Sequence, residues 1–584
     1  MEALAAALAE VEATAARGDK TRVLGEAFAR VAEREPDALA FAVRFVCGDP
    51  LPVGSARPLG VGWRLARDAI EAATGLAPDA IATETRAAGD LGTAISRLLD
   101  ARGDAGGPPL SVTEARDAFE AIARAGARGT KAREVTALVR RGSSAVTRYV
   151  VRALLGEMRV GARAGVVEDA IAAAFGRDAA SVRRAAAITG DVGEAAVLAL
   201  GDALEQATPR VGAPMSFMLA TPIEIARGAP LSSGAWVVED KIDGIRAQLH
   251  VADGGAARLF ARGKGEVTRA FPELVDAARS IDAPAMLDGE IVVVSPDGRP
   301  RPFSALQRRL GRVSPDAALL AELPVRYLAY DLMLSRDGSL LDLAFSERRA
   351  RLEALAGGFA HPMHLHASRA LDGEAAVDAA FELARAGGYE GLVLKRIDAP
   401  YEAGSRGRAW LKVKRALTTL DVVVVAAQRG HGKRAGVLSD YTFAVRGEGD
   451  ALLVVGKAYS GLTDQEIAEL TERFRAIATA PETRGTLPVR PEIVLEVAFD
   501  GVQRSDRHDS GYALRFPRIA RVRDDKQADE IDTLDAVARI FEAQLADGHR
   551  EADPAPPRKA GARRAKAAGQ LSLFGDDDRE PRGR

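Results

Sequence analysis

The chain has 584 residues, too many for one compact core, and at roughly 100–200 residues per domain it predicts about three to five units. Apolar residues make up 47% and charged residues 28%, which is a globular balance and excludes a disordered or fibrous chain. The 80 basic and 82 acidic residues leave a net charge of −2, so overall charge argues neither for nor against nucleic-acid binding.

Cysteine and histidine are scarce. The single Cys47 excludes a disulfide framework and a cysteine-based zinc site, and seven His argue against a His-rich metal site. We find no apolar run of about 20 residues and no charged-then-apolar N-terminal segment, so neither a membrane span nor a secretory signal is expected. We expect a soluble, cytoplasmic protein.

Residues 1–207 are Ala-rich with apolar residues at helical spacing, which predicts an all-α N-terminal domain. Asp90 and Asp191, in short Gly-bounded breaks, are predicted to cap the helices that follow. Residues 121–164 hold ten basic residues against two acidic ones. This run is either a solvated helix face or a surface that follows phosphates. Residues 209–222 are predicted to be a connector.

From residue 235 the pattern changes to short β-rich runs bounded by turns, and residues 208–416 are predicted to form an α+β domain. A helix with Ser346 as its N-cap is expected among them. The expected strands and helix are 236–241, 285–294, 325–333, 391–395 and 346–355.

Residues 417–543 are predicted to form a small β-barrel of the OB type, with several strands and one helix. The tail from 544 to 584 is rich in Ala, Pro, Gly and Arg, so we expect it to be disordered. The expected strands are 421–427, 441–445, 452–458 and 492–499, and the expected helix is 464–478.

Only twelve of the 80 basic residues are Lys. We therefore interpret individual lysines as positions where an amine is needed. An amine, unlike a guanidinium, can lose its proton and attack an electrophile. Lys241 ends an apolar strand immediately before a turn that contains Gly244. This position at the strand end is expected to place the Lys241 side chain at a pocket. Lys-x-Asp-Gly alone is a weak signal. The other lysines of interest are Lys395, Lys412, Lys414, Lys433, Lys457 and Lys526.

Lys241 belongs to an ordered series of motifs, and with them the chain resembles the ATP-dependent DNA ligases of the covalent nucleotidyltransferase superfamily. More loosely, residues 59–62, 89–92 and 155–161 resemble the DNA-binding domain of archaeal and bacterial ligases of replicative type. That second resemblance implies that the basic run grips duplex backbone around a nick. The central motifs are Glu239-Asp-Lys-Ile-Asp-Gly-Ile-Arg246, Leu259-Phe-Ala-Arg262, Leu287-Asp-Gly-Glu290, Ala329-Tyr-Asp331, Glu390-Gly-Leu-Val-Leu-Lys395, Trp410-Leu-Lys-Val-Lys414 and Arg515-Phe-Pro-Arg-Ile-Ala-Arg-Val-Arg-Asp-Asp-Lys526.

The resemblance implies a role for each site residue. Lys241 is the nucleophile that takes AMP from ATP, and Glu290 and Glu390 are the carboxylates expected near Mg²⁺, which prefers oxygen ligands. Arg523 and Lys526 orient the leaving pyrophosphate. The ATP-binding set is Glu239 (adenine), Arg246 (phosphates), Arg262 (ribose and the nick 5′-phosphate), Tyr330 (stacking on adenine), and Glu290, Arg406, Lys412 and Lys414 (further nucleotide contacts).

Blander interpretations stay open for several residues. Glu239 could be a surface strand residue and Tyr330 a core residue. Lys395, Lys433 and Lys457 could equally be solvated or lie along DNA backbone, and His431 is more plausibly a phosphate-side contact than a general base.

The implied reaction is the sealing of nicked duplex DNA in three steps, through lysine–AMP and DNA–adenylate, with a hinge at 414–419. Two alternatives are an RNA-ligase or capping-type enzyme, and a non-catalytic scaffold that binds DNA and the clamp. An NAD-dependent bacterial ligase is disfavoured because one cysteine cannot build its zinc site.

The tail contains Gln570-Leu571-Ser-Leu573-Phe574, which resembles the peptide by which bacterial repair proteins hold the sliding clamp. The alternative is a weakly structured C-terminus. We expect a monomer, because one chain suffices to wrap a nick, and an association with the nucleoid.

Overall fold

The computed structural model describes residues 1–546, with short gaps, and the chain divides into two units that are described separately. The first consists mainly of residues 1–420, and the second mainly of residues 421–495 and 502–537. Within the described residues, no helix is long and apolar enough to cross a membrane. The 570–574 motif, His431 and Lys433 lie outside them. The gaps are 56–57, 104–105, 225–234, 264, 302, 311–313, 374–375, 415–417, 431–433, 435 and 484.

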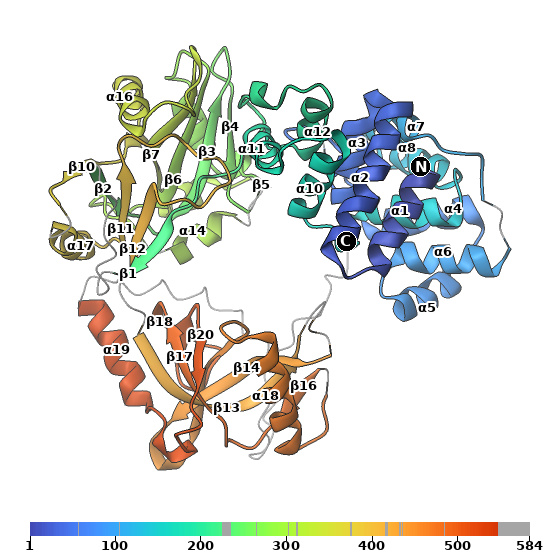
Figure 1. The fold of residues 1–584 in the computed structure, drawn as a ribbon. Coiled ribbons are helices and arrows are strands. Elements are labelled where there is room, and N and C mark those ends of the chain that lie inside the picture. The colour runs from blue at the N-terminus through green and yellow to red at the C-terminus, as the bar shows by residue number, and fades with distance from the viewer. Residues whose placement is uncertain are drawn as a thin grey trace. The chain divides into compact units, whose positions relative to one another are not determined.

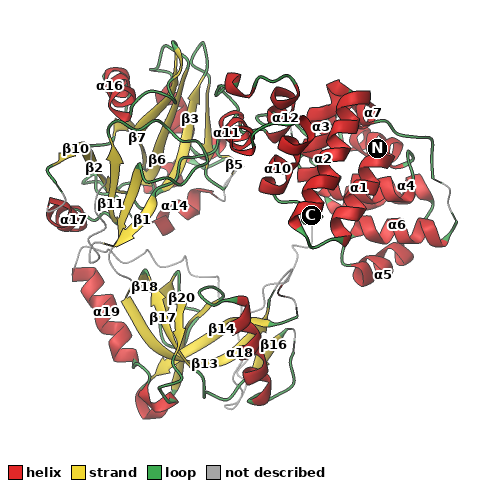
Figure 2. Ribbon diagram, in the orientation of Figure 1, coloured by secondary structure: helices red, strands yellow, loops and turns green. Residues whose placement is uncertain are grey.

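The N-terminal part of the first unit is helical, which confirms the predicted class (Figures 1 and 2). Phe41, Phe45 and Phe119 meet in its core with ring centroids 5.7–6.0 Å apart. The helices are α1 (Glu2–Ala13), α2 (Arg17–Arg34), α3 (Leu39–Cys47), α4 (Trp63–Thr74), α5 (Pro78–Ala88), α6 (Leu91–Ala101), α7 (Val112–Arg124), α8 (Arg128–Val139), α9 (Ser144–Leu155), α10 (Ala164–Phe175), α11 (Ala179–Thr189) and α12 (Val192–Leu200).

Both predicted aspartate caps are confirmed. The Asp90 carboxylate accepts the Thr93 N–H at 2.9 Å at the start of α6, and Asp191 accepts the Gly193 N–H at 2.9 Å at the start of α12. Each carboxylate satisfies a backbone donor that the first helical turn leaves without a partner.

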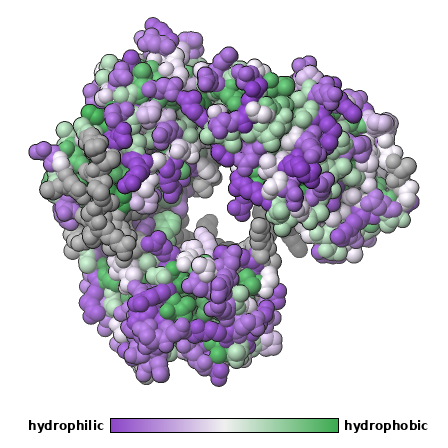
Figure 3. Space-filling view, viewed as in Figure 1, coloured by the Kyte–Doolittle hydropathy of each residue, from purple (hydrophilic) through white to green (hydrophobic). Residues whose placement is uncertain are grey.

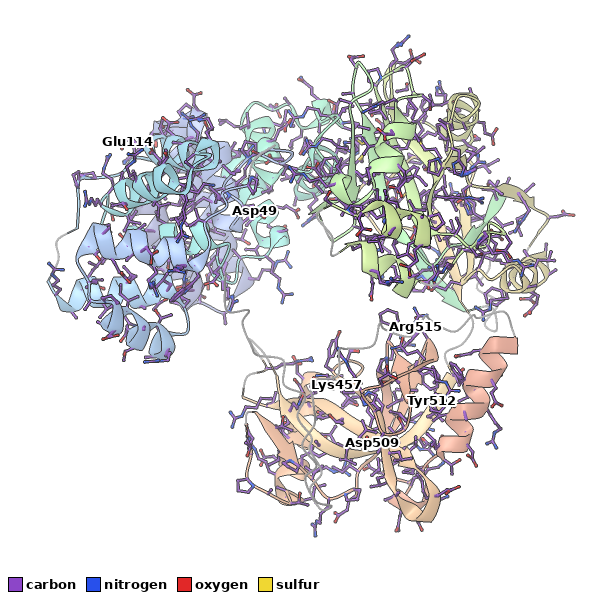
Figure 4. The ribbon with its side chains drawn as sticks, turned by 180° about the vertical axis from the view of Figure 1, so that it is seen from behind. Asp49, Glu114, Lys457, Asp509, Tyr512 and Arg515 are labelled. Carbon is purple, nitrogen blue, oxygen red and sulfur yellow. The ribbon has the colours of Figure 1, made fainter. Side chains whose placement is uncertain are left out.

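The basic run at 121–164 is partly structural. Arg152 is 7% exposed and lies between Glu12 and Asp90, with Nη2 2.8 Å from the Asp90 carboxylate. Arg148 pairs with Glu12 at 2.6 Å, and Arg141 pairs at 2.9 Å with Glu114, which is labelled in Figure 4. Part of the positive charge is therefore neutralised within the helical domain, and neither a solvated face nor a phosphate-tracking surface describes the whole run.

Two β-sheets build the rest of the first unit, as predicted for an α+β domain (Figure 2). The first sheet has the order β1-β12-β11-β2-β10, and the second has β5-β4-β3-β6-β7-β8, with β9 paired to β7. Their strands are β1 (Thr221–Glu224), β2 (Trp236–Lys241), β3 (Ile245–Val251), β4 (Ala257–Ala261), β5 (Gly265–Glu266), β6 (Ala285–Val293), β7 (Val325–Ser335), β8 (Gly338–Ser339), β9 (Met363–Leu365), β10 (Ser368–Leu371), β11 (Gly391–Arg396) and β12 (Trp410–Lys414).

Helices cover both sheets. On the first sheet, Phe381 of α17 shares a buried cluster with Leu392 and Val413. On the second, Leu352 of α16 and Leu274 of α13 join a cluster with β-strand residues. The helices are α13 (Pro272–Ala278), α14 (Phe303–Leu310), α15 (Ala317–Glu322), α16 (Phe345–Ala356) and α17 (Ala376–Ala386).

The predicted N-cap of α16 was wrong. The helix begins at Phe345 with Ala344 as its N-cap, because the Ala344 carbonyl already accepts the Arg348 N–H at 3.1 Å. Ser346 is therefore inside the first turn, and its own N–H donates to the Ile397 carbonyl at 2.9 Å. This long-range hydrogen bond fixes the start of the helix earlier than the local sequence indicates.

The connector predicted at 209–222 is held against strand β3. Gln248 accepts the Met215 N–H at 3.1 Å and donates to the Met215 carbonyl at 2.8 Å. The Gly212 N–H donates to Nδ1 of His250 at 3.0 Å, and burial lowers the pKa of His250 to about 3, so this acceptor stays neutral. The connector thus reaches Leu219 and Ala220, which line the pocket described below, in a fixed path.

The second unit is β-rich, which confirms its predicted class (Figure 1). Its main sheet has the order β15-β14-β13-β17-β20, with β16 paired to β13, and β18 and β19 form a separate hairpin. Hydrophilic side chains predominate on the face of this unit that Figure 3 shows. Its elements are β13 (Thr418–Arg429), β14 (Leu438–Arg446), β15 (Leu452–Ala458), α18 (Asp464–Ala476), β16 (Thr486–Pro488), β17 (Val494–Phe499), β18 (Gly501–Arg504), β19 (Tyr512–Arg515) and β20 (Arg518–Val522), followed by α19 (Leu534–Ala546).

Candidate active site

A pocket of about 210 Å³ is lined by side chains from both sheets of the first unit. Strands β2, β11 and β12 contribute from the first sheet, and β3, β6 and β7 from the second. It brings together eight residues that the sequence predicted: Glu239, Lys241, Arg246, Arg262, Glu290, Tyr330, Arg406 and Lys412.

Strand register places two of these residues on one face of the first sheet. Glu239 lies opposite Val393, and Val393 lies opposite Lys412 on the next strand. Residues opposite each other in adjacent strands point to the same side of a sheet. Glu239 and Lys412 therefore face the pocket together, with Val393 between them. Lys414 continues β12, where its backbone lies opposite Glu224.

The turn after Lys241 needs a glycine. A Cβ on Gly244 would lie 2.4 Å from the Ile291 carbonyl oxygen and 2.8 Å from Cγ of Glu290. Any larger residue would push β6 away from the turn, because such contacts are well inside van der Waals distance. The glycine of Lys-x-Asp-Gly thus lets the loop after the lysine approach the strand that carries Glu290.

Lys241 Nζ hydrogen-bonds to Oε2 of Glu390, and the Glu390 N–H donates to the Lys241 carbonyl at 2.8 Å. Both side chains are only partly exposed. The carboxylate is thus held beside the amine by both a backbone and a side-chain contact, and the amine is held at the pocket wall.

The pKa of the Glu290 carboxyl is strongly raised. Burial raises its pKa to about 8, and the charges of Lys241 and Arg246 oppose that shift without cancelling it. Glu290 and Glu390 supply the hard oxygen donors that suit Mg²⁺, which commonly takes one or two protein carboxylates and completes its shell with phosphates and water. Among the described residues there is no cluster of three or more His, Cys, Asp or Glu that could hold a metal ion.

Arg246 forms part of the pocket frame. Its guanidinium binds Asp288 through Nε at 3.0 Å and Nη2 at 2.6 Å, and Nη1 donates to the Met218 carbonyl at 2.6 Å. The Tyr401 hydroxyl also donates to Asp288, at 2.8 Å. Most donors of Arg246 are therefore used within the protein, and they join the connector to β3 and β6.

One end of the pocket contains a buried ion pair inside aromatic rings. Lys395 is 1% exposed, and its Nζ lies 2.8 Å from Oε2 of Glu239 and 4.4 Å from the ring centroids of both Tyr330 and Trp410. Burial lowers the pKa of Lys395, although Glu239 acts in the opposite direction. The interpretation of Lys395 as a solvated or DNA-backbone residue was therefore wrong, as was that of Glu239 as a surface residue, since Glu239 is 2% exposed.

The second carboxylate oxygen of Glu239 has no hydrogen-bond partner although it is buried. The nearest cation on that side is Arg349, whose Nη1 is 3.9 Å away. A buried acceptor without a donor is costly, and Nη1 of Arg349 is likewise buried without a hydrogen-bond partner. Tyr330, which is 9% exposed, is both a core residue and a wall of the pocket.

The predicted residues of the second unit have partners within that unit. Arg523 and Lys526 both contact Asp421. Lys457, labelled in Figure 4, pairs with Asp440 at 2.9 Å and its side chain is 57% exposed, so Lys457 is a surface residue.

Several further residues contribute to the pocket that were not predicted from the sequence. Trp410 begins β12, the strand that carries the predicted Lys412, and this position in the Trp410–Lys414 motif was a usable signal. His366, whose Nε2 lies 2.9 Å from the Asp240 carbonyl, comes from the segment after β9 and carried no local signal. Asp288 was quoted within Leu287–Glu290 but not assigned a role.

The pocket thus combines an amine at a strand end with carboxylates and further cations, which are the groups that a nucleotide and its phosphates would require. Three family descriptions match the chain in order. "DNA ligase N terminus" matches residues 1–172, "ATP dependent DNA ligase domain" matches 217–414, and "ATP dependent DNA ligase C terminal region" matches 434–526.

Full-length relatives agree. The chain is 41% identical over 557 residues to "Probable DNA ligase" of Koribacter versatilis, covering 91% of this chain and 96% of that protein. It is 35% identical to "DNA ligase" of Archaeoglobus fulgidus, covering 89% and 94%. The fold is also similar to a solved structure named Pmar-Lig_Pre, with a TM-score of 0.54, 15% identity and coverage of 89% and 99%.

The chain belongs to the ATP-dependent DNA ligases. It is an ATP-using enzyme that joins nicked DNA, and the RNA-ligase, capping and scaffold alternatives are set aside.

Proposed function

We propose that Lys241 carries the AMP intermediate of this ligase. The amine gives up a proton, and its lone pair attacks the α-phosphorus of ATP. A nitrogen–phosphorus bond forms, the bond from the α-phosphorus to its bridging oxygen breaks, and pyrophosphate leaves. The observation that carries the proposal is that Lys241, Glu290, Glu390 and Lys412 lie together around one pocket or at its edge.

Two further displacements complete the reaction. An oxygen of the 5′-phosphate at the nick attacks the phosphorus of lysine–AMP, which breaks the nitrogen–phosphorus bond and frees Lys241. The 3′-hydroxyl then attacks that 5′-phosphate, loses its proton and displaces AMP. All of these transition states are anionic, so fixed cations such as Lys412 are expected to stabilise them.

The base of ATP is proposed to lie at the end of the pocket that holds Glu239. The partnerless carboxylate oxygen of Glu239 is an acceptor suited to the amino group of adenine, and Tyr330 supplies an aromatic face for stacking. Arg262 and Arg406 are exposed at the pocket, where cations can reach ribose and phosphate oxygens. Arg246 and Lys414 complete the nucleotide-binding set, with Arg246 acting chiefly by fixing the pocket frame.

Mg²⁺ is proposed to bind through Glu290 and Glu390 together with ATP phosphate oxygens. When bound, it supplies positive charge that favours ionised Glu290 and neutralises the phosphates. Because the pKa of Glu290 is raised to about 8, Mg²⁺ would have to displace a proton from this carboxyl to bind there.

In the second unit, Arg523 and Lys526 are proposed to orient pyrophosphate during lysine adenylylation. The helical N-terminal domain is proposed to grip duplex backbone through the basic side chains of 121–164 that are not used within the domain. One chain has every part that the reaction needs, which supports a monomer.

The deciding experiment incubates the full-length enzyme with ATP labelled at the α-phosphate and follows label on the protein after denaturation. Lys241→Ala should abolish the covalent label, whereas Lys457→Ala, a surface lysine paired with Asp440, should retain it. Label that persists in Lys241→Ala would identify another nucleophile and overturn the proposal.

We also propose that residues 570–574 bind the bacterial sliding clamp. The support is the spacing of Leu571, Leu573 and Phe574 after Gln570, in a polar, Arg-rich tail. Full-length enzyme should bind clamp, and a peptide of residues 566–580 should compete. If replacing Leu573 and Phe574 with Ala left clamp binding unchanged, the motif would have no such role.

A further inference from the structure

Two cations of the second unit converge on one carboxylate. Nη1 of Arg523 lies 3.0 Å from both carboxylate oxygens of Asp421, and Nζ of Lys526 lies 2.7 Å from Oδ2 of the same residue. Asp421 belongs to β13 and precedes Arg523 by 102 residues. Asp421 therefore brings the two cations together, and the motif that contains Arg523 and Lys526 does not indicate this partner.

Asp421 is itself fixed. Its backbone N–H donates to Oδ2 of Asp532 at 2.8 Å, and its carbonyl accepts the Asp532 N–H at 2.9 Å. The side chains of Asp421 and Arg523 are each 13% exposed, so water competes weakly for their contact. A charge-assisted hydrogen bond in such surroundings holds the direction of the guanidinium.

The other edge of Arg523 is bound by a carboxylate that is itself exposed. Nε and Nη2 bind Asp525 at 2.9 and 2.8 Å, but the Asp525 side chain is 63% exposed. An anion from solution can therefore compete for the edge that faces Asp525, whereas the edge that faces Asp421 stays occupied. Arg523 is thus fixed on the side of Asp421, and its opposite edge binds a carboxylate that an anion can displace.

We propose that Asp421 is a positioning residue that sets the spacing of Arg523 and Lys526 before they meet pyrophosphate. Two neighbouring cations repel each other, and an anion between them offsets this repulsion and restricts their rotamers. Cations that are already in position need less reorganisation free energy when the transition state forms. The inference rests on the proposed role of Arg523 and Lys526.

The test is Asp421→Asn in the full-length enzyme, a change that keeps the shape and removes the charge. Because both cations lose the negative charge that they share, lysine adenylylation should fall by about tenfold or more. The reverse reaction, release of AMP from preformed enzyme–AMP by added pyrophosphate, should fall by the same factor, with a higher KM for pyrophosphate. Sealing of a nick that already carries adenylate should stay within about twofold, because pyrophosphate takes no part in it.

The matched control is Asp440→Asn, which removes a carboxylate of similar exposure that pairs with Lys457 in the same unit. It should leave all three rates unchanged. A purely structural role for Asp421 would lower sealing of the adenylated nick together with adenylylation, and that result would overturn the inference.

The double variant Arg523→Ala/Lys526→Ala distinguishes a failure of the proposed pyrophosphate role from a failure of the inference about Asp421. If it adenylylates normally, the proposed pyrophosphate role fails. If it is defective while Asp421→Asn is normal, only the inference about Asp421 fails. If both are defective, adding Asp421→Asn to the double variant should cause no further loss, since the residues that Asp421 positions are already absent.

Discussion

Lys395→Met should destabilise the first unit by leaving a buried carboxylate without its cation. Methionine has a similar length and keeps contact with the Tyr330 and Trp410 rings. Glu239, 2% exposed, would lose a partner that lies 2.8 Å away. The ligand-free enzyme suffices for this measurement, so the effect on stability is separated from any effect on ATP.

The magnitude follows from the geometry. Unit charges 2.8 Å apart attract by roughly 6 kcal/mol at an effective dielectric constant of about 20, before desolvation is subtracted. Removing one partner of a buried pair typically costs about 3–5 kcal/mol. Arg349 lies 3.9 Å from the other oxygen of Glu239 and retains some compensating charge. We therefore expect a loss of about 3 kcal/mol, at the lower end of that range.

Urea unfolding followed by tryptophan fluorescence measures this loss, because Trp236 and Trp410 both lie in the first sheet. The control Lys457→Met, at an exposed pair, should change stability by less than about 1 kcal/mol. Adding Glu239→Gln to Lys395→Met removes the stranded charge and should recover most of the loss. If the double variant is as unstable as Lys395→Met, the loss comes from packing, and the charge argument is refuted.

Three further changes test other contacts. Gly244→Ala should lower lysine adenylylation at least about tenfold, because its Cβ would clash with β6, whereas Gly126→Ala, with nothing within 4 Å of its Cβ, should not; equal rates would refute the requirement for glycine. Glu290 has a pKa raised from 4.5 to about 8, so wild-type stability should decline as pH rises through that interval, and Glu290→Gln should flatten the decline in urea unfolding; parallel curves would contradict the shifted pKa. Arg152→Met should lower the free energy of unfolding by about 3–5 kcal/mol, since two carboxylates lose a nearly buried partner. Arg124→Met, at an exposed pair, should lower it by less than about 1 kcal/mol, and similar losses in the two variants would show that burial is not the cause.

Local sequence predicted much of the strand framework. β2 spans the predicted residues 236–241, and β15 spans the predicted 452–458, because apolar alternation and bounding turns are local properties. The start of α16 was missed, because the carbonyl that accepts the Ser346 N–H belongs to Ile397. Such a contact is absent from any window of sequence around the helix.

The same distinction holds at the site. Motif residues such as Lys241 and Glu290 could be found because their chemistry and spacing are both visible in the sequence. The carboxylates that hold the cations could not, since Asp288 follows Arg246 by 42 residues and Asp421 precedes Arg523 by 102. An aspartate carries no sequence signal that distinguishes an ion-pair partner from a solvated surface residue.

These hidden carboxylates also fix the direction of the arginine side chains that they bind. A guanidinium has donors on more than one edge, so a carboxylate can bind one edge while another remains available. In the first unit Arg246 binds Asp288 on one edge and the Met218 carbonyl through Nη1. In the second unit Arg523 binds Asp421 through Nη1 and the exposed Asp525 through its other edge. Lysine offers a single ammonium, and Lys241 shares its ammonium with Glu390, so in the proposed reaction it must release that contact. The arginines are thus suited to fixed positions, and a lysine is suited to the role proposed for Lys241.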